Sequence, residues 1–185
     1  MKKGINQYVS WVLICLTLLL AASLDQATKD ALKVQHVLKT IEEHAPGDKG
    51  SADVTEQELN AYIGYRLKQK EDTLIRRLAV QMIGENRIRG DLRLDAGRLN
   101  LGIILGDDLA FEFMGGVVTR AGAVRLDLEA LWLNGRAVQP VVLDMVLKAV
   151  SMYHGRDIGG LDDWYELPKG VDRVRVDKGK AVLFY

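Results

Sequence analysis

Cysteine is almost absent from this 185-residue sequence, and the single one, Cys15, lies inside an apolar run near the N-terminus. The sequence therefore has no cysteine pair for a disulfide and no thiol nucleophile beyond that run. Ile14 is bulkier than the small residue that lipoprotein processing requires before the modified cysteine, which argues against lipidation at Cys15. A chain of this length buries a sizeable core as one domain and needs no disulfides to fold.

An excess of charge is also lacking, because 25 basic residues face 25 acidic ones. Removal of residues 1–23 takes away Lys2 and Lys3 and no acidic residue, which leaves a net charge of about −2. This balance argues against binding to nucleic acid or to an anionic membrane through bulk charge.

Long apolar runs are missing apart from residues 9–22. Lys2 and Lys3 precede this run and the small residues Ala21 and Ser23 end it, which is the layout of a secretory signal peptide. The run is shorter than the ~18 apolar residues that a membrane span usually needs. We therefore predict cleavage after Ser23 and export to the bacterial periplasm; the alternative is that residues 9–22 remain as an inner-membrane anchor.

Motifs for catalysis and metal binding are absent, since the sequence contains no G-x-S-x-G, no H-E-x-x-H and no phosphate-binding glycine loop. His36, His44 and His154 are interpreted as solvated or locally bonded side chains. The pairs Asp107-Asp108 and Asp162-Asp163 adjoin glycines, which favours turns over acid–base chemistry or calcium binding. We expect no enzyme activity, no cofactor and no metal. The enzymatic alternative requires a cleft that brings His154 near Asp162 or Asp163.

Two helices are predicted before the first strand. Within residues 25–43 apolar side chains recur at helical spacing, as at Ala31, Val34 and Ile41. Residues 45–53 are rich in glycine and small polar residues and predict a flexible linker, so we interpret the first helix as a stalk or partner-binding element outside the core. The second helix begins at Thr55 with a capping box, in which Thr55 and Glu58 bond each other's backbone amides.

After Leu74 the apolar period changes to two, which predicts an antiparallel β-meander. We expect turns at residues 95–97, 106–108 and 134–135, and a strand end at residues 115–116. Arg76, Arg77, Arg87 and Arg89 favour protection of sheet edges over phosphate binding. Pro140 predicts the start of a strongly apolar helix, and residues 173–185 predict a closing hairpin.

The order of these elements, with "VTEQELNAYIGYRL" at the start and "VQPVVLDMVLKAVSMY" before the last hairpin, resembles a family of small bacterial envelope proteins with a tubular lipid-binding (TULIP-like) fold. The resemblance covers residues 54–185 and implies an α+β fold in which a twisted antiparallel meander wraps around the long apolar helix. Residues 1–23 are then a signal peptide or anchor, and residues 24–53 an amphipathic helix with its linker. The helix that begins at Thr55 would close one side of the sheet's apolar surface.

The predicted function is non-catalytic binding or transfer of a lipid or other hydrophobic amphiphile in the cell envelope. A meander bent around an apolar helix with adaptable methionines can leave a groove or tunnel for an acyl chain, although periodicity does not distinguish it from a filled interior. The candidate lining residues are Leu101, Ile103, Phe111, Phe113, Leu126, Leu128 and Met145. The alternative is an envelope scaffold or interaction module with a filled core and no ligand, in which residues 25–43 contact a protein partner.

Overall fold

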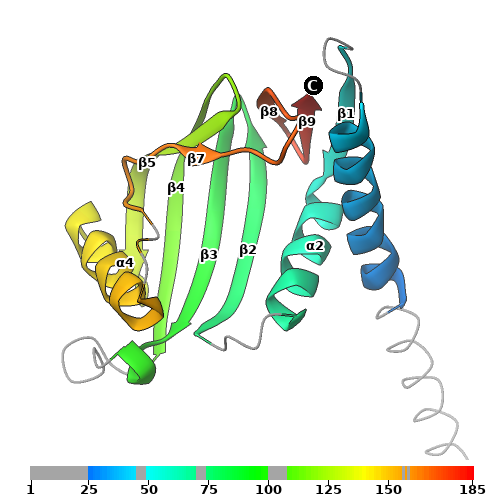
Figure 1. The fold of residues 1–185 in the computed structure, drawn as a ribbon. Helices are drawn as coiled ribbons and strands as arrows, with labels where there is room; N and C mark the ends of the chain where they lie inside the picture. Colours follow the sequence, from blue (N-terminus) through cyan, green and yellow to red (C-terminus); the bar gives the residue numbers. More distant parts are fainter. Residues whose placement is uncertain (1–24, 45–48, 70–73, 100–107, 156, 158) are drawn as a thin grey trace, which may run out of the picture.

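The computed structural model describes residues 25–44, 49–69, 74–99, 108–155, 157 and 159–185. Over these residues the chain has an α+β fold with two antiparallel sheets (Figure 1). This confirms the predicted α+β class and the antiparallel pairing, but not a meander wrapped around a long apolar helix. The larger sheet has the order β2-β3-β4-β5-β6, with β7 pairing to β5, and the smaller has the order β1-β9-β8. The elements are a helix at residues 25–43, β1 (Ser51–Thr55), α2 (Glu56–Gln69), β2 (Ile75–Gly84), β3 (Arg87–Asp95), the 3₁₀ helix η1 (Ala96–Leu99), β4 (Asp108–Arg120), β5 (Ala123–Leu133), β6 (Arg136–Ala137), α4 (Pro140–His154), β7 (Tyr165–Glu166), β8 (Arg173–Asp177) and β9 (Lys180–Phe184).

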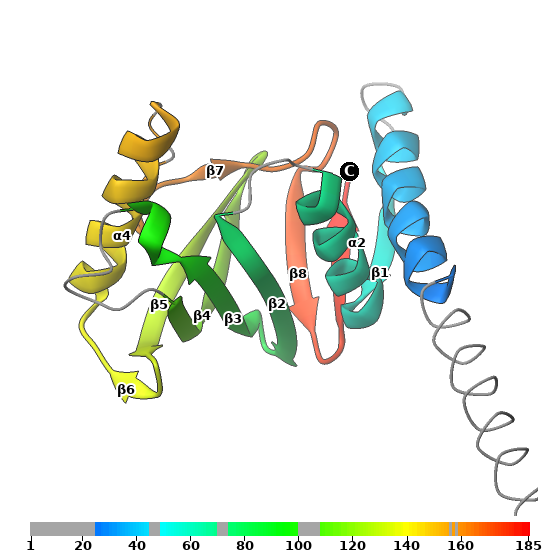
Figure 2. The same ribbon diagram turned by 90° about the horizontal axis from the view of Figure 1, so that it is seen from below.

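The N-terminal helix, residues 25–43, has the predicted extent but lies within the fold. Its apolar residues Ala31, Val34 and Ile41 are at most 3% exposed. Lys33 forms an ion pair with Glu58 of α2, and the amide of Gln57 donates a hydrogen bond to Asp30 over 2.7 Å. The helix lies alongside α2 and β1 (Figure 2). Interpretation of this helix as a stalk is therefore wrong, because its apolar side is covered by the rest of the chain.

The predicted linker is shorter than expected, since Ser51–Thr55 form β1 and pair antiparallel with β9 at the other end of the chain. Gly50 and Tyr185 extend this pairing with two backbone hydrogen bonds, of 2.8 and 3.1 Å. Five residues of mixed polarity give no clear periodic signal, so the strand depends on its distant partner.

The capping box at the start of α2 is confirmed. The Glu58 carboxylate accepts a hydrogen bond from the Thr55 amide over 2.9 Å, and the Thr55 hydroxyl accepts one from the Glu58 amide over 3.2 Å. The helix then runs along the outer edge of β2. There the Asn60 side chain donates to the Val80 carbonyl and accepts from the Val80 amide, both over 2.7 Å, and Glu56 accepts from the Met82 amide over 2.6 Å. α2 thus completes hydrogen bonds that an edge strand would leave open.

The meander contains one turn whose position was not predicted, and it differs from its prediction at another. β2 and β3 are joined by Glu85 and Asn86, whose φ angles of 55° and 57° suit the turn of a two-residue hairpin. Residues 95–97, predicted as a hairpin turn, instead lead into η1, whose Ala96 and Leu99 are buried. The hairpin prediction there is wrong because burial of these two side chains favours a helical turn. The strand predicted from Leu99 onward falls on residues 100–107, which lie outside the described residues.

The glycine pair in β4 does not end a strand as predicted. β4 continues to Arg120, and its pairing with β5 shifts register between Met114 and Gly115. A Cβ at Gly115 would lie 2.5 Å from the Asp127 carbonyl oxygen, so a glycine is required where the two backbones approach at this bulge. The turn expected after β5 is confirmed, since Asn134 and Gly135 form it with φ angles of 50° and 77°. Of the turn expected at residues 106–108, the first two residues lie outside the described residues, and Asp108 already belongs to β4.

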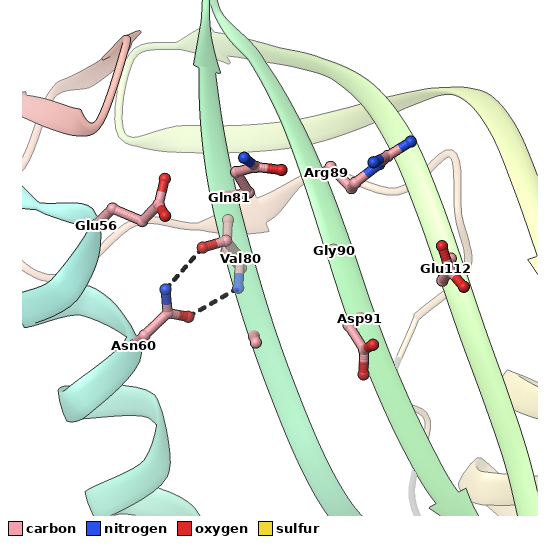
Figure 3. Close-up of a pocket in the computed structure, with 9 residues that line it drawn as sticks. Glu56, Asn60, Val80, Gln81, Arg89, Gly90, Asp91 and Glu112 are labelled. Carbon is pink, nitrogen blue, oxygen red and sulfur yellow. Dashed lines mark hydrogen bonds between the residues drawn. The ribbon is translucent and has the colours of Figure 1, made fainter.

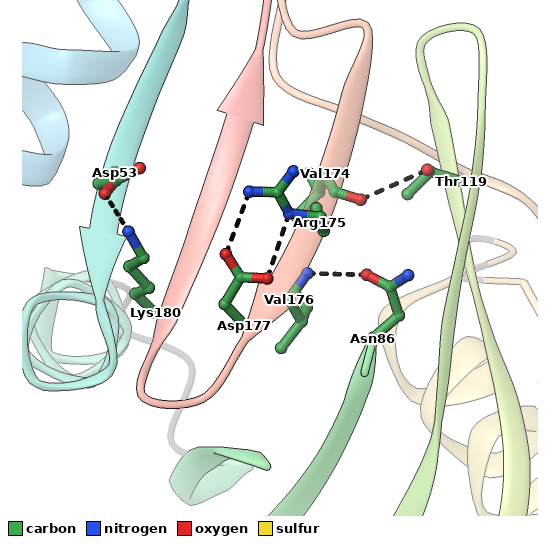
Figure 4. Close-up of polar contacts among 8 residues, drawn as sticks. All are labelled: Asp53, Asn86, Thr119, Val174, Arg175, Val176, Asp177 and Lys180. Carbon is green, nitrogen blue, oxygen red and sulfur yellow. Dashed lines mark hydrogen bonds and ion pairs between the residues drawn. The ribbon is translucent and has the colours of Figure 1, made fainter. Parts of the chain in front are cut away.

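The closing hairpin β8–β9, which was predicted, docks against the larger sheet through polar contacts (Figure 4). The Val176 amide donates to the Asn86 side chain over 2.9 Å, and the Asn86 amide donates to the Val176 carbonyl over 3.0 Å. Thr119 reaches the Val174 carbonyl over 3.4 Å. On the exposed face of the smaller sheet, Lys180 pairs with Asp53.

Candidate functional site

The two faces of the larger sheet differ in chemistry. Leu92 lies opposite Phe111, and Phe111 opposite Leu133, so these side chains project from the same face. The same register defines an apolar face, which consists of Leu78, Val80, Met82, Ile88, Gly90, Leu92, Leu94, Leu109, Phe111, Phe113, Gly115, Val117, Thr119, Val124, Leu126, Leu128, Leu131 and Leu133. The polar face carries most of the sheet's charged side chains.

One end of the apolar face is covered by α4. Leu143, Val146, Ala149 and Val150 of this helix are buried against the sheet and η1. They form the first cluster, together with Leu74, Leu94, Ala96, Leu99, Leu109, Phe111 and Leu131. Pro140 opens the helix and Gly155 ends it in the left-handed conformation with φ of 63°. A helix therefore begins at Pro140 as predicted, but it covers one end of the apolar face, and the predicted wrapping of the meander around a long apolar helix is not confirmed.

The other end is covered by the β8–β9 hairpin. Val176 and Ala181 are buried together with Met82, and Leu59, Ile88, Val117 and Val174 pack around them. This second cluster shares no buried residue with the first. In Figure 2, α4 and β8 lie at opposite ends of the sheet, with β7 between them. The apolar face thus has two covers that come from different parts of the chain.

Between the two clusters the apolar side chains are only half-buried. Leu78, Val80, Val124 and Leu126 are partly exposed and belong to neither cluster. The ring of Phe113 lies across Gly90, where an added Cβ would meet three ring carbons at less than 3.0 Å. This middle strip of the apolar face is the candidate site. It is defined by Leu78, Val80, Val124 and Leu126 together with Phe113, which is half-buried and packs against the first cluster.

The predicted lining residues fall in three environments. Phe111 is fully buried in the first cluster, while Phe113, Leu126 and Leu128 are half-buried on the apolar face. Met145 lies on the exposed side of α4 and is 52% exposed. Leu101 and Ile103 lie outside the described residues. Leu78, Val80 and Val124 were not predicted as lining, although the alternation of apolar residues in β2 and β5 could have indicated them.

α4 is covered on one side only. Val141, Met145 and Met152 line its outer side and are 55%, 52% and 76% exposed. The sequence predicted a largely covered helix because apolar residues occur around its whole circumference. The structure corrects this expectation: the sheet contacts one side of α4, and the opposite side faces solvent.

A polar cleft of about 270 Å³ lies where α2 meets the polar face of the larger sheet (Figure 3). Its wall includes Arg89, Asp91 and Glu112 of the sheet, together with Glu56 and Asn60 of α2. The last two side chains already bond the backbone of β2, as described above. Asp91 lies directly opposite Glu112, and Arg77 and Arg93 approach its carboxylate to 3.9 and 3.8 Å. These contacts offset the repulsion between the two acids.

Three acidic or phenolic groups have shifted pKa values with a structural cause. Burial opposes ionisation of Glu58, but hydrogen bonds from Lys33 and Thr55 outweigh it and lower its pKa. A 2.8 Å hydrogen bond from Arg76 lowers the pKa of Asp95. Burial, followed by the nearby carboxylates of Asp163, Asp157 and Asp144, raises the pKa of Tyr165. Since Glu58 caps α2, and Arg76 of β2 holds Asp95 at the end of β3, the interactions that cause the first two shifts stabilise the fold.

Asp163 and His44 have local roles. Asp163 accepts a hydrogen bond from the Gly160 amide over 2.6 Å, which confirms the predicted turn. The His44 ring bonds the Thr40 carbonyl over 2.6 Å and contacts Tyr185. Within the described ranges, no group of three His, Asp or Glu side chains is arranged to hold a metal ion.

No helix among the described residues is sufficiently long and apolar to span a membrane, and the predicted segment 9–22 lies outside them. Comparisons with protein-family models, with curated proteins and with solved structures gave no match to this chain.

Proposed function

We propose that this protein binds the acyl chain of a lipid or similar amphiphile along the apolar face of its larger sheet, in the manner of TULIP-like proteins. The observation that carries the proposal is the middle strip, where a continuous apolar sheet face is left half-buried between two separate clusters. A filled interior would join these clusters into one. The predicted signal peptide would place such a carrier in the periplasm.

The energetics favour an extended apolar ligand. Each methylene moved from water onto an apolar surface contributes about 0.8 kcal/mol, so affinity is expected to grow with chain length. Phe113 and Leu126 bracket the bulge and are only half-buried, which leaves side-chain surface for such contacts. We include Leu128 in the lining and Leu101 and Ile103 as further candidates, but exclude Met145, since it lies on the exposed side of α4.

The test is a comparison of two tryptophan substitutions on opposite faces of the sheet. Leu126→Trp adds bulk to the middle strip, whereas Val118→Trp adds the same side chain to the polar face, where Val118 is 37% exposed. Val117 lies opposite Leu126, and Val118 opposite Arg125, so the two sites are neighbours with opposite orientation. Binding of a fluorescent fatty acid is expected to weaken at least about tenfold in Leu126→Trp and to stay within about twofold in Val118→Trp.

Native mass spectrometry of detergent-free protein provides a second readout, in which the wild type is expected to retain lipid. Absence of bound lipid together with no uptake of added fatty acid or phospholipid would refute the proposal. Equal binding by the wild type and Leu126→Trp would refute the assigned strip, because a side chain of that size occupies the space proposed for the ligand.

The alternative, an envelope scaffold without ligand, is favoured by one observation, the exposed side of α4. Three large apolar side chains, Val141, Met145 and Met152, face solvent along one helix and could contact a partner protein. Under this alternative, replacing all three with serine abolishes co-purification of a partner and leaves fatty-acid binding undetectable in every variant. Fatty-acid binding that is retained in this triple variant supports the lipid proposal instead.

A further inference from the structure

Two arginines and a tryptophan form a cluster at the end of the larger sheet where β4 turns into β5. The Arg120 guanidinium lies 4.0 Å from the centre of the Trp164 ring, and that of Arg125 lies 5.2 Å from the same centre. Trp164 immediately precedes β7, which pairs with the start of β5. Because Arg120 lies opposite Ala123, and Arg125 opposite Val118, both arginines project from the polar face of the sheet.

These two arginines differ from four of the other arginines on this sheet. Arg76, Arg77, Arg87 and Arg93 each have a carboxylate partner in the structure. Within the described part of the chain, neither Arg120 nor Arg125 forms an ion pair. Both positive charges lie beside the same Trp164 ring, without a carboxylate to offset their mutual repulsion. A guanidinium that lies over an indole ring is held by cation–π attraction, and its N–H groups remain donors for a further ligand.

A cleft of about 780 Å³ adjoins the cluster, a size suited to a small molecule. Arg120 and Trp164 form one wall, and residues 166–172 form the other. The second wall is fixed in place, since the Leu167 amide donates to the Gly122 carbonyl and the Gly122 amide donates to the Asp172 carbonyl, both over 2.9 Å. Lys169 also lines the cleft and is paired with Glu42 over 3.1 Å.

We infer that a phosphate group binds at the Arg120–Arg125–Trp164 cluster beside this cleft, with the two guanidinium groups as the ligands to its oxygens and Trp164 as the platform that orients them. Arg120 and Trp164 line the cleft, whereas Arg125 lies outside its lining and contacts the same ring. Planar guanidinium groups with free N–H edges match the geometry of phosphate oxygens and bind them with charge-assisted hydrogen bonds. Glu166 and Asp172 also line the cleft, so its charge is not uniformly positive. This favours one compact phosphate beside a neutral or cationic group over a polyanion such as nucleic acid.

The phosphate could belong to a lipid head group or to a soluble phosphorylated molecule, and three probes separate these sources. Inorganic phosphate, glycerol 3-phosphate and dihexanoyl phosphatidic acid are titrated into the full-length protein by calorimetry, with the indole N–H signal of Trp164 followed by NMR. Tighter binding of dihexanoyl phosphatidic acid than of glycerol 3-phosphate assigns the site to lipid head groups. Equal binding of the two assigns it to soluble phosphates.

The decisive comparison uses matched pairs of arginine substitutions on the same sheet face. Arg120→Gln/Arg125→Gln is expected to weaken phosphate binding at least about tenfold, and Arg120→Lys/Arg125→Lys by less, because lysine keeps the charge but not the planar fork. The control Arg77→Gln/Arg93→Gln removes the same charge and is expected to bind as the wild type does. The lysine pair retains the net charge and serves as the test if the glutamine pair fails to fold.

Two results would overturn the inference: no saturable binding of any probe by the wild type up to about 10 mM, or equal loss of binding in the control pair. Equal loss would show that affinity follows net charge instead of the cluster. The inference does not depend on the apolar strip, since Leu126→Trp leaves this cleft unchanged. Failure of either proposal is therefore distinguishable from failure of the other.

Discussion

The substitution Gly90→Ala tests whether the ring of Phe113 occupies the middle of the apolar face as described. Gly90 lies directly opposite Phe113 in the β3–β4 pairing. An added methyl group would lie within 3.0 Å of the ring carbons Cε1, Cε2 and Cζ, closer than non-bonded carbons approach in proteins. The ring must therefore leave its position, and the surrounding side chains must adjust.

The expected cost follows from two opposing effects. Overpacking of a fitted site destabilises by about 1–3 kcal/mol, whereas replacing glycine with alanine within a strand removes a conformational penalty of about 0.5–1 kcal/mol. We expect a net loss of about 1–2 kcal/mol in the free energy of unfolding. Phe113→Ala alone removes roughly 100 Å² of buried apolar surface at 25 cal/mol per Å², a loss of about 2.5 kcal/mol.

The assay is urea denaturation of the two single variants and of the double variant, followed by circular dichroism. With the ring absent, Gly90→Ala is expected to be neutral or stabilising by up to about 1 kcal/mol, so the double-mutant cycle shows strong coupling. Gly64→Ala in α2 is the matched control. No atom lies within 4 Å of a Cβ at Gly64, so the same exchange is expected to stabilise by about 0.5–1 kcal/mol.

An unfolding free energy for Gly90→Ala equal to that of the wild type would contradict this reasoning. Additive effects in the double variant would contradict it as well, because the penalty is assigned entirely to the overlap between the added methyl group and the Phe113 ring.

Two further predictions concern α2. Asn60→Ala removes both hydrogen bonds to Val80 at the sheet edge, so we expect the free energy of unfolding to fall by about 1–3 kcal/mol in urea denaturation. Hydrogen exchange at the Val80 amide is expected to become faster. An unchanged exchange rate at that amide would contradict the contact between Asn60 and the sheet edge. The pKa of Glu58 is lower in the folded protein than its ordinary value of 4.5. The ionised carboxylate therefore stabilises the fold above roughly pH 4.5, and this stabilisation is lost as the pH falls through the folded-state pKa. Glu58→Gln is therefore expected to lose less stability than the wild type between about pH 5 and 3, and a parallel loss in both proteins would contradict the assignment.

Local patterns predicted most of the elements. The Thr55–Glu58 capping box, Pro140 at the start of α4 and the two-residue period after Leu74 each act within a few residues, so they are readable without knowledge of the fold. The errors occurred where a distant contact decided the outcome. β1 depends on β9, and the Gly115 bulge depends on the Asp127 carbonyl across the sheet.

The candidate site was predictable only in part. Alternation marked Phe113, Leu126 and Leu128 as members of an apolar face, and the structure places them there. Helical periodicity could not show which side of α4 meets the sheet, so Met145 was assigned to the lining although it faces solvent. Arg120, Arg125 and Trp164 gave no motif, because β7 brings the tryptophan to β5 from a separate part of the chain.

The composition of the chain and the spacing of its apolar residues were sufficient to predict an α+β fold with an antiparallel meander, because backbone propensity and side-chain alternation are local properties. The tertiary structure alone decided that two separate elements cover the apolar face and leave a strip between them. It also decided that two arginines without an ion pair in the described part of the chain share one indole. Both outcomes depend on the register and packing of segments far apart in sequence, which no local pattern encodes.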